Sequence, residues 1–294
     1  MKTLIGLDVG GTLIKATALR GDGTVLGQWK RPTEDRPVEG APLFVRTARE
    51  MLAEINLPDA LIGVAAPGLA SPDGRSIAFM PERMHGLEGL DWTVALGAQR
   101  PVPVLNDAHA ALLGEVWCGA AAGSRDVVML TLGTGVGGAI LTDGRLLRGI
   151  RNRAGHFGHV WVGGGLERSL AGMPGSLDMA VGNASLQARS EGRFRSTHEL
   201  VAAHLGGDTE ATRIWLKSLE ALALALASFV NILDPEAIIL GGGIARAGAA
   251  LFEPLKSLLD EYEWRPANQC VRIVPALLDE WAGTYGAARQ TLAL

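Results

Sequence analysis

Apolar runs punctuated by glycine turns occur twice along the chain with the same layout. The first copy has its runs at 3–8, 13–19 and 24–27, and the second has them at 126–132, 137–141 and 145–148. Gly-Gly-Thr or Gly-Thr-Gly turns separate the first two runs of each copy, and Asp-Gly turns precede the third. Aliphatic and β-branched runs with such turns are typical of antiparallel hairpins. The repetition predicts a duplicated α/β fold of two lobes with a cleft between them.

The rest of the chain alternates between helical spacing and short buried runs. Helices are predicted at 42–55, 108–117, 209–233 and from Gly283 onward, and strands at 60–66, 101–105, 237–240 and 271–274. Gly, Ser and Asn are frequent between 151 and 195, which predicts an irregular functional loop. We place the N-terminal lobe at 1–117 plus 281–294 and the C-terminal lobe at 118–280.

Composition argues against several classes of function. The formal charge of −4 and pI near 5.9 leave no general basic surface for nucleic acid or an anionic membrane. Cys118 and Cys270 lack paired spacing, which suits a reducing cytosol. Asp8 interrupts the first apolar run before a signal-peptide core forms, so we expect a cytoplasmic protein. The apolar stretch from Leu219 to Leu233 is too short and polar for a membrane span and is expected to be a core helix.

The first glycine turn, Gly10-Gly11-Thr12, can bring backbone N–H groups against a phosphate. In a kinase, Asp8 would hold Mg²⁺ or its waters, Thr12 would bond phosphate oxygens and Lys15 would add positive charge. The alternative is an ordinary hairpin turn.

Two further glycine clusters are candidate nucleotide-binding turns. The first of them comprises Gly133, Thr134, Gly135, Gly137 and Gly138. Its spacing fits a dinucleotide fingerprint, which requires a helix directly after the glycines, whereas this sequence continues as a strand. The other cluster, Gly241 to Gly243, follows a predicted strand, where a base or ribose could approach closely, although a plain turn needs glycine too.

Asp107 is the candidate general base. It follows a predicted strand and starts a helix, the usual place for a ligand site in an α/β sheet. A sugar hydroxyl does not ionise at neutral pH, so a carboxylate that accepts its proton assists phosphoryl transfer. Asn106 and Asp107 are also favoured helix N-caps, so capping is the alternative role.

Six segments together resemble the ROK sugar-kinase family, in order and over nearly the whole chain: 7–12, 66–68, 105–111, 130–138, 154–159 and 240–243. The resemblance implies a two-lobed actin/hexokinase-like (ribonuclease H-like) ATPase fold, ATP and Mg²⁺ as cosubstrates, and transfer to the 6-hydroxyl of a hexose. It implies a homodimer and, by family frequency, glucose as substrate. The sugar-binding residues that it implies are Gly68, Asn106, Asp107, His156, His159 and Asp178.

The sequence departs from the family where three cysteines and a histidine usually bind a structural zinc. Ser169, Ala171 and Ser176 stand at the cysteine positions. Serine and alanine supply no thiolate, so we expect no zinc and a purely sugar-binding role for His159. We expect packing through Leu166, Leu170, Met173 and Leu177 to order this loop instead.

The expected sugar pocket also departs from the family. His156 replaces the usual Glu, and Asp178 stands for a longer Glu. A His at this position is similar to some N-acetylmannosamine kinases, so that sugar or another hexosamine is the alternative substrate. The family's Asn in the loop after Ala-Pro-Gly is replaced near Glu82-Arg83.

Two alternatives to an enzyme follow from the same family. A ROK-type repressor needs a helix-turn-helix before the first strand, and we expect none because that strand begins at residue 3. A sugar-sensing pseudokinase would explain the lost cysteines, although Asp8, Asp107 and both phosphate turns are retained.

Overall fold

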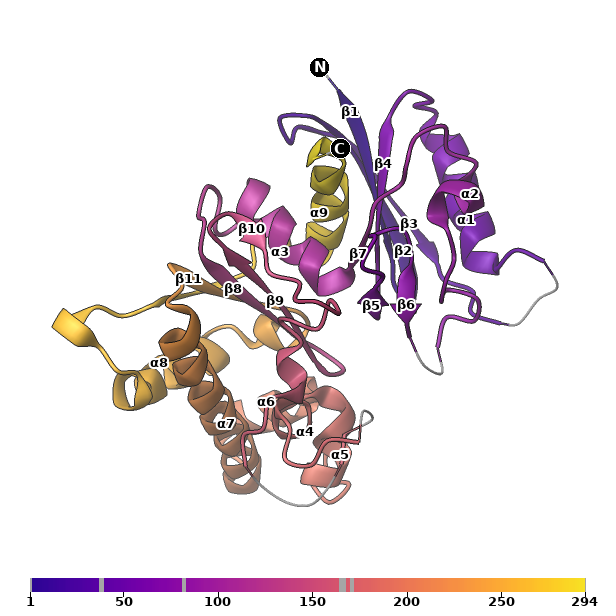
Figure 1. The fold of residues 1–294 in the computed structure, drawn as a ribbon. Coiled ribbons are helices and arrows are strands. Elements are labelled where there is room, and N and C mark those ends of the chain that lie inside the picture. The colour runs from indigo at the N-terminus through magenta and orange to yellow at the C-terminus, as the bar shows by residue number, and fades with distance from the viewer. Residues whose placement is uncertain (1, 37–39, 81–82, 164–167, 170–171, 294) are drawn as a thin grey trace. The chain divides into compact units, whose positions relative to one another are not determined.

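The computed structural model describes residues 2–36, 40–80, 83–163, 168–169 and 172–293. The chain forms two compact units (Figure 1). Unit 1 comprises Met1–Ser124, Leu146–Ala154 and Leu277–Leu294, and unit 2 comprises Arg125–Arg145 and Gly155–Ala276. These bounds differ from the expected lobes, because residues 118–124, 146–154 and 277–280 belong to unit 1.

Unit 1 is built on a five-stranded sheet of order β3-β2-β1-β4-β7. The strands are β1 (Thr3–Val9), β2 (Leu13–Arg20), β3 (Val25–Pro32), β4 (Leu61–Ala66) and β7 (Val104–Asn106). The first three are antiparallel, and β4 and β7 run parallel to β1. A two-stranded ribbon, β5 (Leu69–Ala70) with β6 (Ile77–Phe79), follows β4. The strand predicted at 101–105 starts only at Val104, because Pro101 and Pro103 have no N–H to donate to a sheet.

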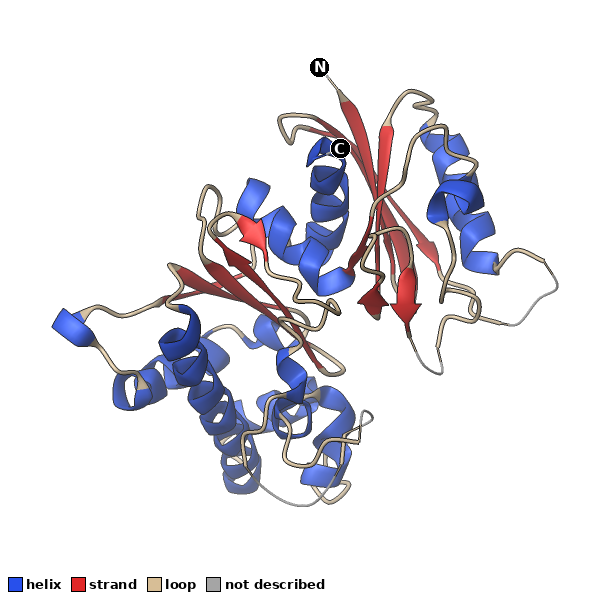
Figure 2. Cartoon of the chain, in the orientation of Figure 1, coloured by secondary structure: helices blue, strands red, loops and turns tan. Residues whose placement is uncertain are grey.

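Helices cover both faces of this sheet (Figure 2). The helices α1 (Leu43–Ile55) and α2 (Trp92–Leu96) contribute Phe44, Met51 and Trp92 to a core that includes Ile5 and Leu7. The helices α3 (Asp107–Cys118) and α9 (Ala282–Gln290) pack on the other face, where Tyr285 meets Leu4.

Glycines let α3, α9 and β1 approach closely. A Cβ on Gly286 would lie 1.7 Å from the Ala110 carbonyl oxygen, and a Cβ on Gly6 would lie 1.7 Å from that of Thr284. The buried Glu115 carboxylate then joins two chain segments, because it accepts hydrogen bonds from the backbone of Ala120, Leu277 and Leu278. These three bonds explain why the segments after residues 118 and 276 belong to unit 1.

Unit 2 repeats the strand order of unit 1 in a second sheet, β10-β9-β8-β11-β12. Its strands are β8 (Val127–Leu132), β9 (Val136–Thr142), β10 (Arg145–Leu146), β11 (Ala237–Gly241) and β12 (Arg272–Pro275). The first two form an antiparallel pair, and β11 and β12 run parallel to β8. The duplication predicted from the sequence is therefore confirmed strand by strand.

Five helices complete unit 2: α4 (Leu177–Val181), α5 (Leu186–Arg189), α6 (Thr197–Leu205), α7 (Thr209–Leu233) and α8 (Ala249–Tyr262). At 25 residues α7 is longer than the apolar stretch considered in the sequence, and by length and composition alone it could cross a membrane. Its buried side includes Trp215, Leu222 and Phe229, which pack into the core of unit 2. The indole Nε1 of Trp215 donates to the Ala250 carbonyl at 2.9 Å, so α7 is a core helix.

Candidate active site

The first phosphate turn connects β1 to β2 in unit 1. The Gly10 N–H donates to the Leu13 carbonyl at 3.0 Å, and the Gly10 carbonyl accepts from the Thr33 hydroxyl at 2.7 Å. Gly11 and Thr12 are exposed at the tip. The turn is thus held from below while its tip faces solvent, as a phosphate-binding turn requires.

Two carboxylates lie beside this turn. Asp8 is the last residue but one of β1 and pairs with Lys15, whose Nζ lies 3.4 Å from Oδ2. Burial raises the pKa of Asp8, and the Lys15 charge counteracts part of that shift. Gly283 leaves room for this side chain, because a Cβ there would lie 3.1 Å from the Asp8 carboxylate.

Asp107 is the second carboxylate. Burial first, and the neighbouring negative charge of Asp8 second, raise its pKa to about 6. By surface area Asp107 is exposed, which weakens the effect of burial, but the Asp8 charge alone gives the same direction. A carboxyl with a pKa near 6 is a stronger proton acceptor than an ordinary aspartate and is still ionised at neutral pH.

The helix-capping role falls to Asn106. Its Oδ1 accepts from the N–H groups of Ala108 at 3.0 Å and His109 at 3.2 Å, and its Nδ2 donates to the Gly68 carbonyl at 2.9 Å. Asp107 is the first residue of α3, and its Oδ1 accepts from the adjacent Ala108 N–H at 2.8 Å. Hydrogen bonds from the Ala108 backbone and the Asn106 side chain offset part of the rise in the pKa of Asp107.

Gly68 and Arg83 occupy the loops that approach these residues. Gly68 has φ +98°, and a Cβ there would lie 2.5 Å from the Phe79 carbonyl oxygen. The backbone conformation and the lack of space both require glycine at this position. The Arg83 guanidinium lies over the first phosphate turn, 3.0 Å from where a Gly11 Cβ would be. Asp35 holds the loop after Arg83 by accepting from the N–H groups of Met84 at 2.7 Å and His85 at 2.8 Å. Glu82, the other residue singled out there, lies outside the described residues.

The second phosphate turn connects β8 to β9 in unit 2. The strand β9 follows it directly, which excludes the dinucleotide fingerprint. The Gly133 and Thr134 carbonyls accept from the N–H groups of Asn183 and Ala184, each at 2.9 Å, so a neighbouring segment supports the turn.

Some glycines of the two clusters are packed against other atoms, and others have open space around them. Gly137 and Gly138 lie within β9, and a Cβ on Gly138 would lie 2.4 Å from the Phe157 ring. Gly241 ends β11, and Gly242 has φ +87° with its missing Cβ against the Leu132 backbone. Nothing lies within 4 Å of a Cβ built on Gly133 or Gly243, so these two are the glycines open to a ligand.

A cavity of about 520 Å³ joins the second turn to the glycine cluster after β11. Gly133, Thr134 and Gly243 line it, as predicted residues of the nucleotide site. The sequence analysis missed the rest of the lining, which comes from Asn183, α6 and the segment after Gly243. Only Arg246, three residues beyond Gly243, had a signal in the sequence, because it follows a glycine cluster at a strand end.

The predicted sugar-binding residues of unit 2 gather around a short 3₁₀ turn, Phe157–His159. The His156 and His159 rings stack with centroids 6.4 Å apart. Asp178 Oδ1 accepts from the Val136 N–H at 2.5 Å, and a Cβ on Gly135 would lie 2.9 Å from that oxygen. Asp178 therefore also fixes the second phosphate turn, a role that its sequence position did not suggest.

A family model described as "ROK family" matches residues 4–293. The chain belongs to the ROK family. Among curated ROK relatives, the glucokinase of Thermotoga maritima is 31% identical over 97% of this chain and 96% of its own length. The N-acetylmannosamine kinase of Vibrio cholerae is 32% identical over 99% of both chains. A ROK glucokinase from Streptomyces griseus, solved with glucose and AMPPNP, has a TM-score of 0.80 at 25% identity, over 99% of this chain and 100% of that one. The chain thus has the actin/hexokinase-like fold of ROK sugar kinases.

In the loop where this ROK chain lacks cysteines, the residues that the structure describes are joined by hydrogen bonds. Ser176 caps α4 by accepting from Met179 N–H at 3.4 Å, and Ser169 accepts from Met173 N–H at 3.3 Å. The Val162 N–H donates to Gly175 and the Leu177 N–H to Val160, both at 2.9 Å.

The packing proposed for this loop is only partly right. Leu177 is fully buried, but Met173 is 38% exposed. Leu166, Leu170 and Ala171 lie outside the described residues. Within the described ranges no group of three or more His, Cys, Asp or Glu side chains is placed to hold a metal ion.

Proposed function

We propose that this chain transfers the γ-phosphoryl group of ATP to the 6-hydroxyl of a hexose. Its membership of the ROK family and its similarity to curated glucokinases and an N-acetylmannosamine kinase make it an ATP-dependent sugar kinase. The relative crystallised with AMPPNP supports ATP as the donor. We expect the enzyme to act in the cytoplasm as a homodimer.

The observation that carries the proposal is the state of Asp107. Asn106 performs the capping of α3, so the carboxylate beside Asp8 is not needed for the helix. Its raised pKa of about 6 suits a group that accepts the proton of the attacking hydroxyl. Asp107 would take that proton as the sugar oxygen bonds the γ-phosphorus and ADP leaves.

Mg²⁺ fits the residues around Asp8. Carboxylate oxygens are the ligands that Mg²⁺ prefers, and Asp8 lies at the foot of the first phosphate turn. A cation there would offset the effect of the Asp8 charge, which raises the pKa of Asp107. When bound, Mg²⁺ would neutralise charge on the phosphate oxygens. Asp8 would hold the ion through water, while Thr12 and Lys15 contact the phosphates.

The cavity beside Gly133, Thr134 and Gly243 is our proposed place for the adenosine part of ATP. Its volume of about 520 Å³ is within the range of small-molecule sites. Glycines 241 to 243 leave the backbone open to a base or ribose, and the N–H groups of Thr134 and Gly135 would face phosphates, since the Gly133 N–H donates to the Gly135 carbonyl.

We propose that the sugar contacts Gly68, Asn106, His156, His159 and Asp178, with glucose as the expected substrate. One observation favours N-acetylmannosamine as a second candidate. His156 replaces a carboxylate with a ring that can both donate and accept, which suits an acyl carbonyl. Its ring lies almost parallel to that of His159, with the ring centroids 6.4 Å apart, so one hexosamine would contact both imidazoles.

An ADP-release assay with purified protein, ATP and Mg²⁺ over a sugar panel tests the proposal. Glucose, mannose, N-acetylglucosamine and N-acetylmannosamine are the core of the panel, with Asp107→Asn as the blank. We expect one hexose to give turnover well above that blank. If no sugar releases ADP while the protein still binds sugar, the pseudokinase alternative is correct.

A further inference from the structure

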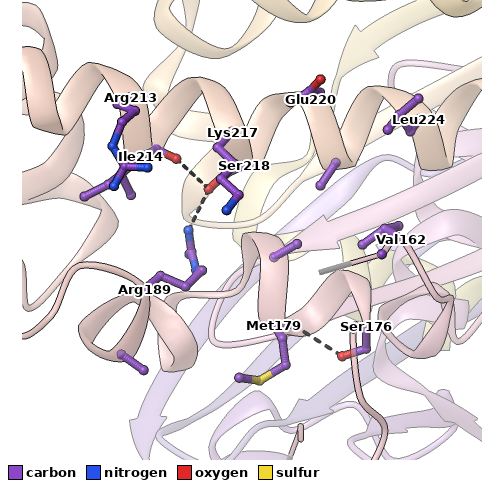
Figure 3. A pocket seen from close by; sticks show the side chains of 15 residues that line it. Val162, Ser176, Met179, Arg189, Arg213, Ile214, Lys217, Ser218, Glu220 and Leu224 are labelled. Atoms are coloured by element: carbon purple, nitrogen blue, oxygen red, sulfur yellow. Dashed lines mark hydrogen bonds between the residues drawn. The ribbon is translucent and has the colours of Figure 1, made fainter. Parts of the chain in front are cut away.

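A separate cavity in unit 2 lies between α7 and the short helices α4 and α5 (Figure 3). Its volume is about 370 Å³. Val162, Met179 and Leu224 form an apolar wall, and Ser176 and Ser218 add hydroxyl groups. None of the lining residues belongs to the proposed nucleotide cavity.

Arg189 forms the cationic floor of this cavity. Its Nε donates to the Ser185 hydroxyl at 3.1 Å and its Nη1 to the Ser218 hydroxyl at 2.6 Å, a bond drawn in Figure 3. Its Nη2 donates to the Gly182 carbonyl at 3.0 Å. Every one of these acceptors is neutral. In the described part of the chain no carboxylate pairs with this guanidinium, and burial lowers its pKa to about 10.

Lys217, the residue before Ser218 on α7, adds a second unpaired charge to the lining. Within the described residues its ammonium group makes no hydrogen bond or ion pair. The other two charged residues of the lining are already engaged. Arg213 binds Glu210 through two hydrogen bonds, and Glu220 accepts from the Tyr262 hydroxyl at 3.3 Å.

Three cations, Arg189, Arg213 and Lys217, line the cavity against one carboxylate, Glu220, so the lining has an excess of positive charge even with Arg213 paired to Glu210. A partly buried cation with only neutral partners is costly, and an anion in the same cavity removes that cost. The geometry of the guanidinium leaves a donor for such an anion, because Nη1 carries a second hydrogen beyond the one given to Ser218.

We propose that this cavity binds a small metabolite that has one phosphate or carboxylate group. Arg189 and Lys217 hold the anionic group, and the body of the ligand packs against Val162, Met179 and Leu224. The volume suits a molecule of that size, since small-molecule sites start near 300 Å³. The site is independent of the proposed kinase reaction.

Methyl NMR of the full chain tests the site directly, because Met179 lines it and Met51 lies in the core of unit 1. Inorganic phosphate, glucose 6-phosphate and succinate are titrated separately to about 10 mM, a range that covers weak metabolite binding. A Met179→Leu variant assigns the signal. We expect a saturable shift of the Met179 methyl with at least one probe and no shift of Met51.

Charge variants decide whether the ligand sits where we propose. Lys217→Ala should weaken the binding by about tenfold, the usual effect of losing one charged hydrogen bond. Lys217→Glu should abolish it. Lys256→Ala on α8 removes the same charge from an exposed position of unit 2 and should change nothing. We avoid Arg189 variants because that side chain also holds α5.

The probes separate the two possible sources of the anion. Saturation by both phosphate probes but not by succinate assigns a phosphate ester, and the converse assigns a carboxylate. The proposal is overturned if no probe gives a saturable Met179 shift. It is equally overturned if the Lys217 variants bind as the wild type does, since the probe would then act from another site.

Discussion

Asp107→Asn should remove turnover and, at the same time, make the folded protein more stable at neutral pH. The amide keeps the size of the side chain and one acceptor, but it cannot take up the hydroxyl proton. Loss of a general base typically costs about 10²–10⁴ in rate. Sugar binding should be largely intact, because the remaining contacts of the pocket are unchanged.

The stability gain follows from the raised pKa of Asp107. A carboxyl that holds its proton more tightly in the folded state favours unfolding once it is ionised. The penalty is absent below the ordinary pKa of 3.8 and complete above about 6. That difference corresponds to roughly 3 kcal/mol as a ceiling, and the solvent exposure of Asp107 reduces it to about 1 kcal/mol.

Two assays check this reasoning. Steady-state kinetics should show kcat/KM of the wild type rising with pH through about 6 and levelling off above it, as the base becomes fully ionised. Thermal unfolding should give the Asn variant a midpoint higher by about 2–4 °C at pH 7.5 and no gain at pH 4. Asp59→Asn, the same substitution at an exposed position distant in sequence from Asp107, is the matched control. A variant with the wild-type rate would refute the role of Asp107 as base, and an equal gain at both pH values would refute the charge argument.

Four further predictions concern the loop, the pocket, the turn and the fold. Elemental analysis should find no stoichiometric zinc, and one zinc per chain lost together with activity on chelation would contradict this. His156→Glu should shift the kcat/KM ratio toward glucose and away from N-acetylmannosamine by about tenfold, since a carboxylate accepts from sugar hydroxyls but cannot donate to an acyl carbonyl. An unchanged ratio would mean that His156 does not contact the part of the sugar that differs. Arg83→Ala should lower kcat/KM for ATP by about tenfold through loss of a phosphate contact, whereas Arg100→Ala should not. Glu115→Gln should lower the free energy of unfolding in urea by about 2 kcal/mol, because an amide cannot accept all three backbone hydrogen bonds. If the unfolding curves of the variant and the wild type coincide, the three hydrogen bonds of Glu115 add nothing to stability.

The elements that could be predicted from the sequence are those whose signals are local. Both hairpins were found because Gly and Asp-Gly turns act on the residues beside them, and α7 was found from its apolar spacing. The strand predicted at 101–105 begins only at Val104 in the structure, because its two prolines have no N–H to donate to the sheet. The assignment of capping to Asn106 and not to Asp107 depends on which side chain reaches the next N–H groups, which residue type alone does not decide.

The parts of the site that could not be predicted depend on contacts between distant segments. The support of the second phosphate turn by Asn183 joins residues 50 positions apart in the chain. The position of Arg83 above Gly11 depends on Asp35, which bonds the backbone of a loop almost fifty residues later. The cationic cavity combines Arg189 with Lys217, and neither residue belongs to a recognisable motif. Such pairs become visible only when the backbone is placed.

The packing of α9 has a consequence for the order in which the chain is completed during synthesis. This helix covers β1 and α3 with contacts so close that glycines are required at residues 6 and 286. Since a ribosome makes β1 long before α9, a growing chain leaves Leu4 and its apolar neighbours uncovered while all the elements between them are made. The segment 125–276 carries its own core and is finished earlier. Unit 1 is therefore begun first and closed last, and its incomplete sheet is the form in which this protein is most open to chaperones and to aggregation.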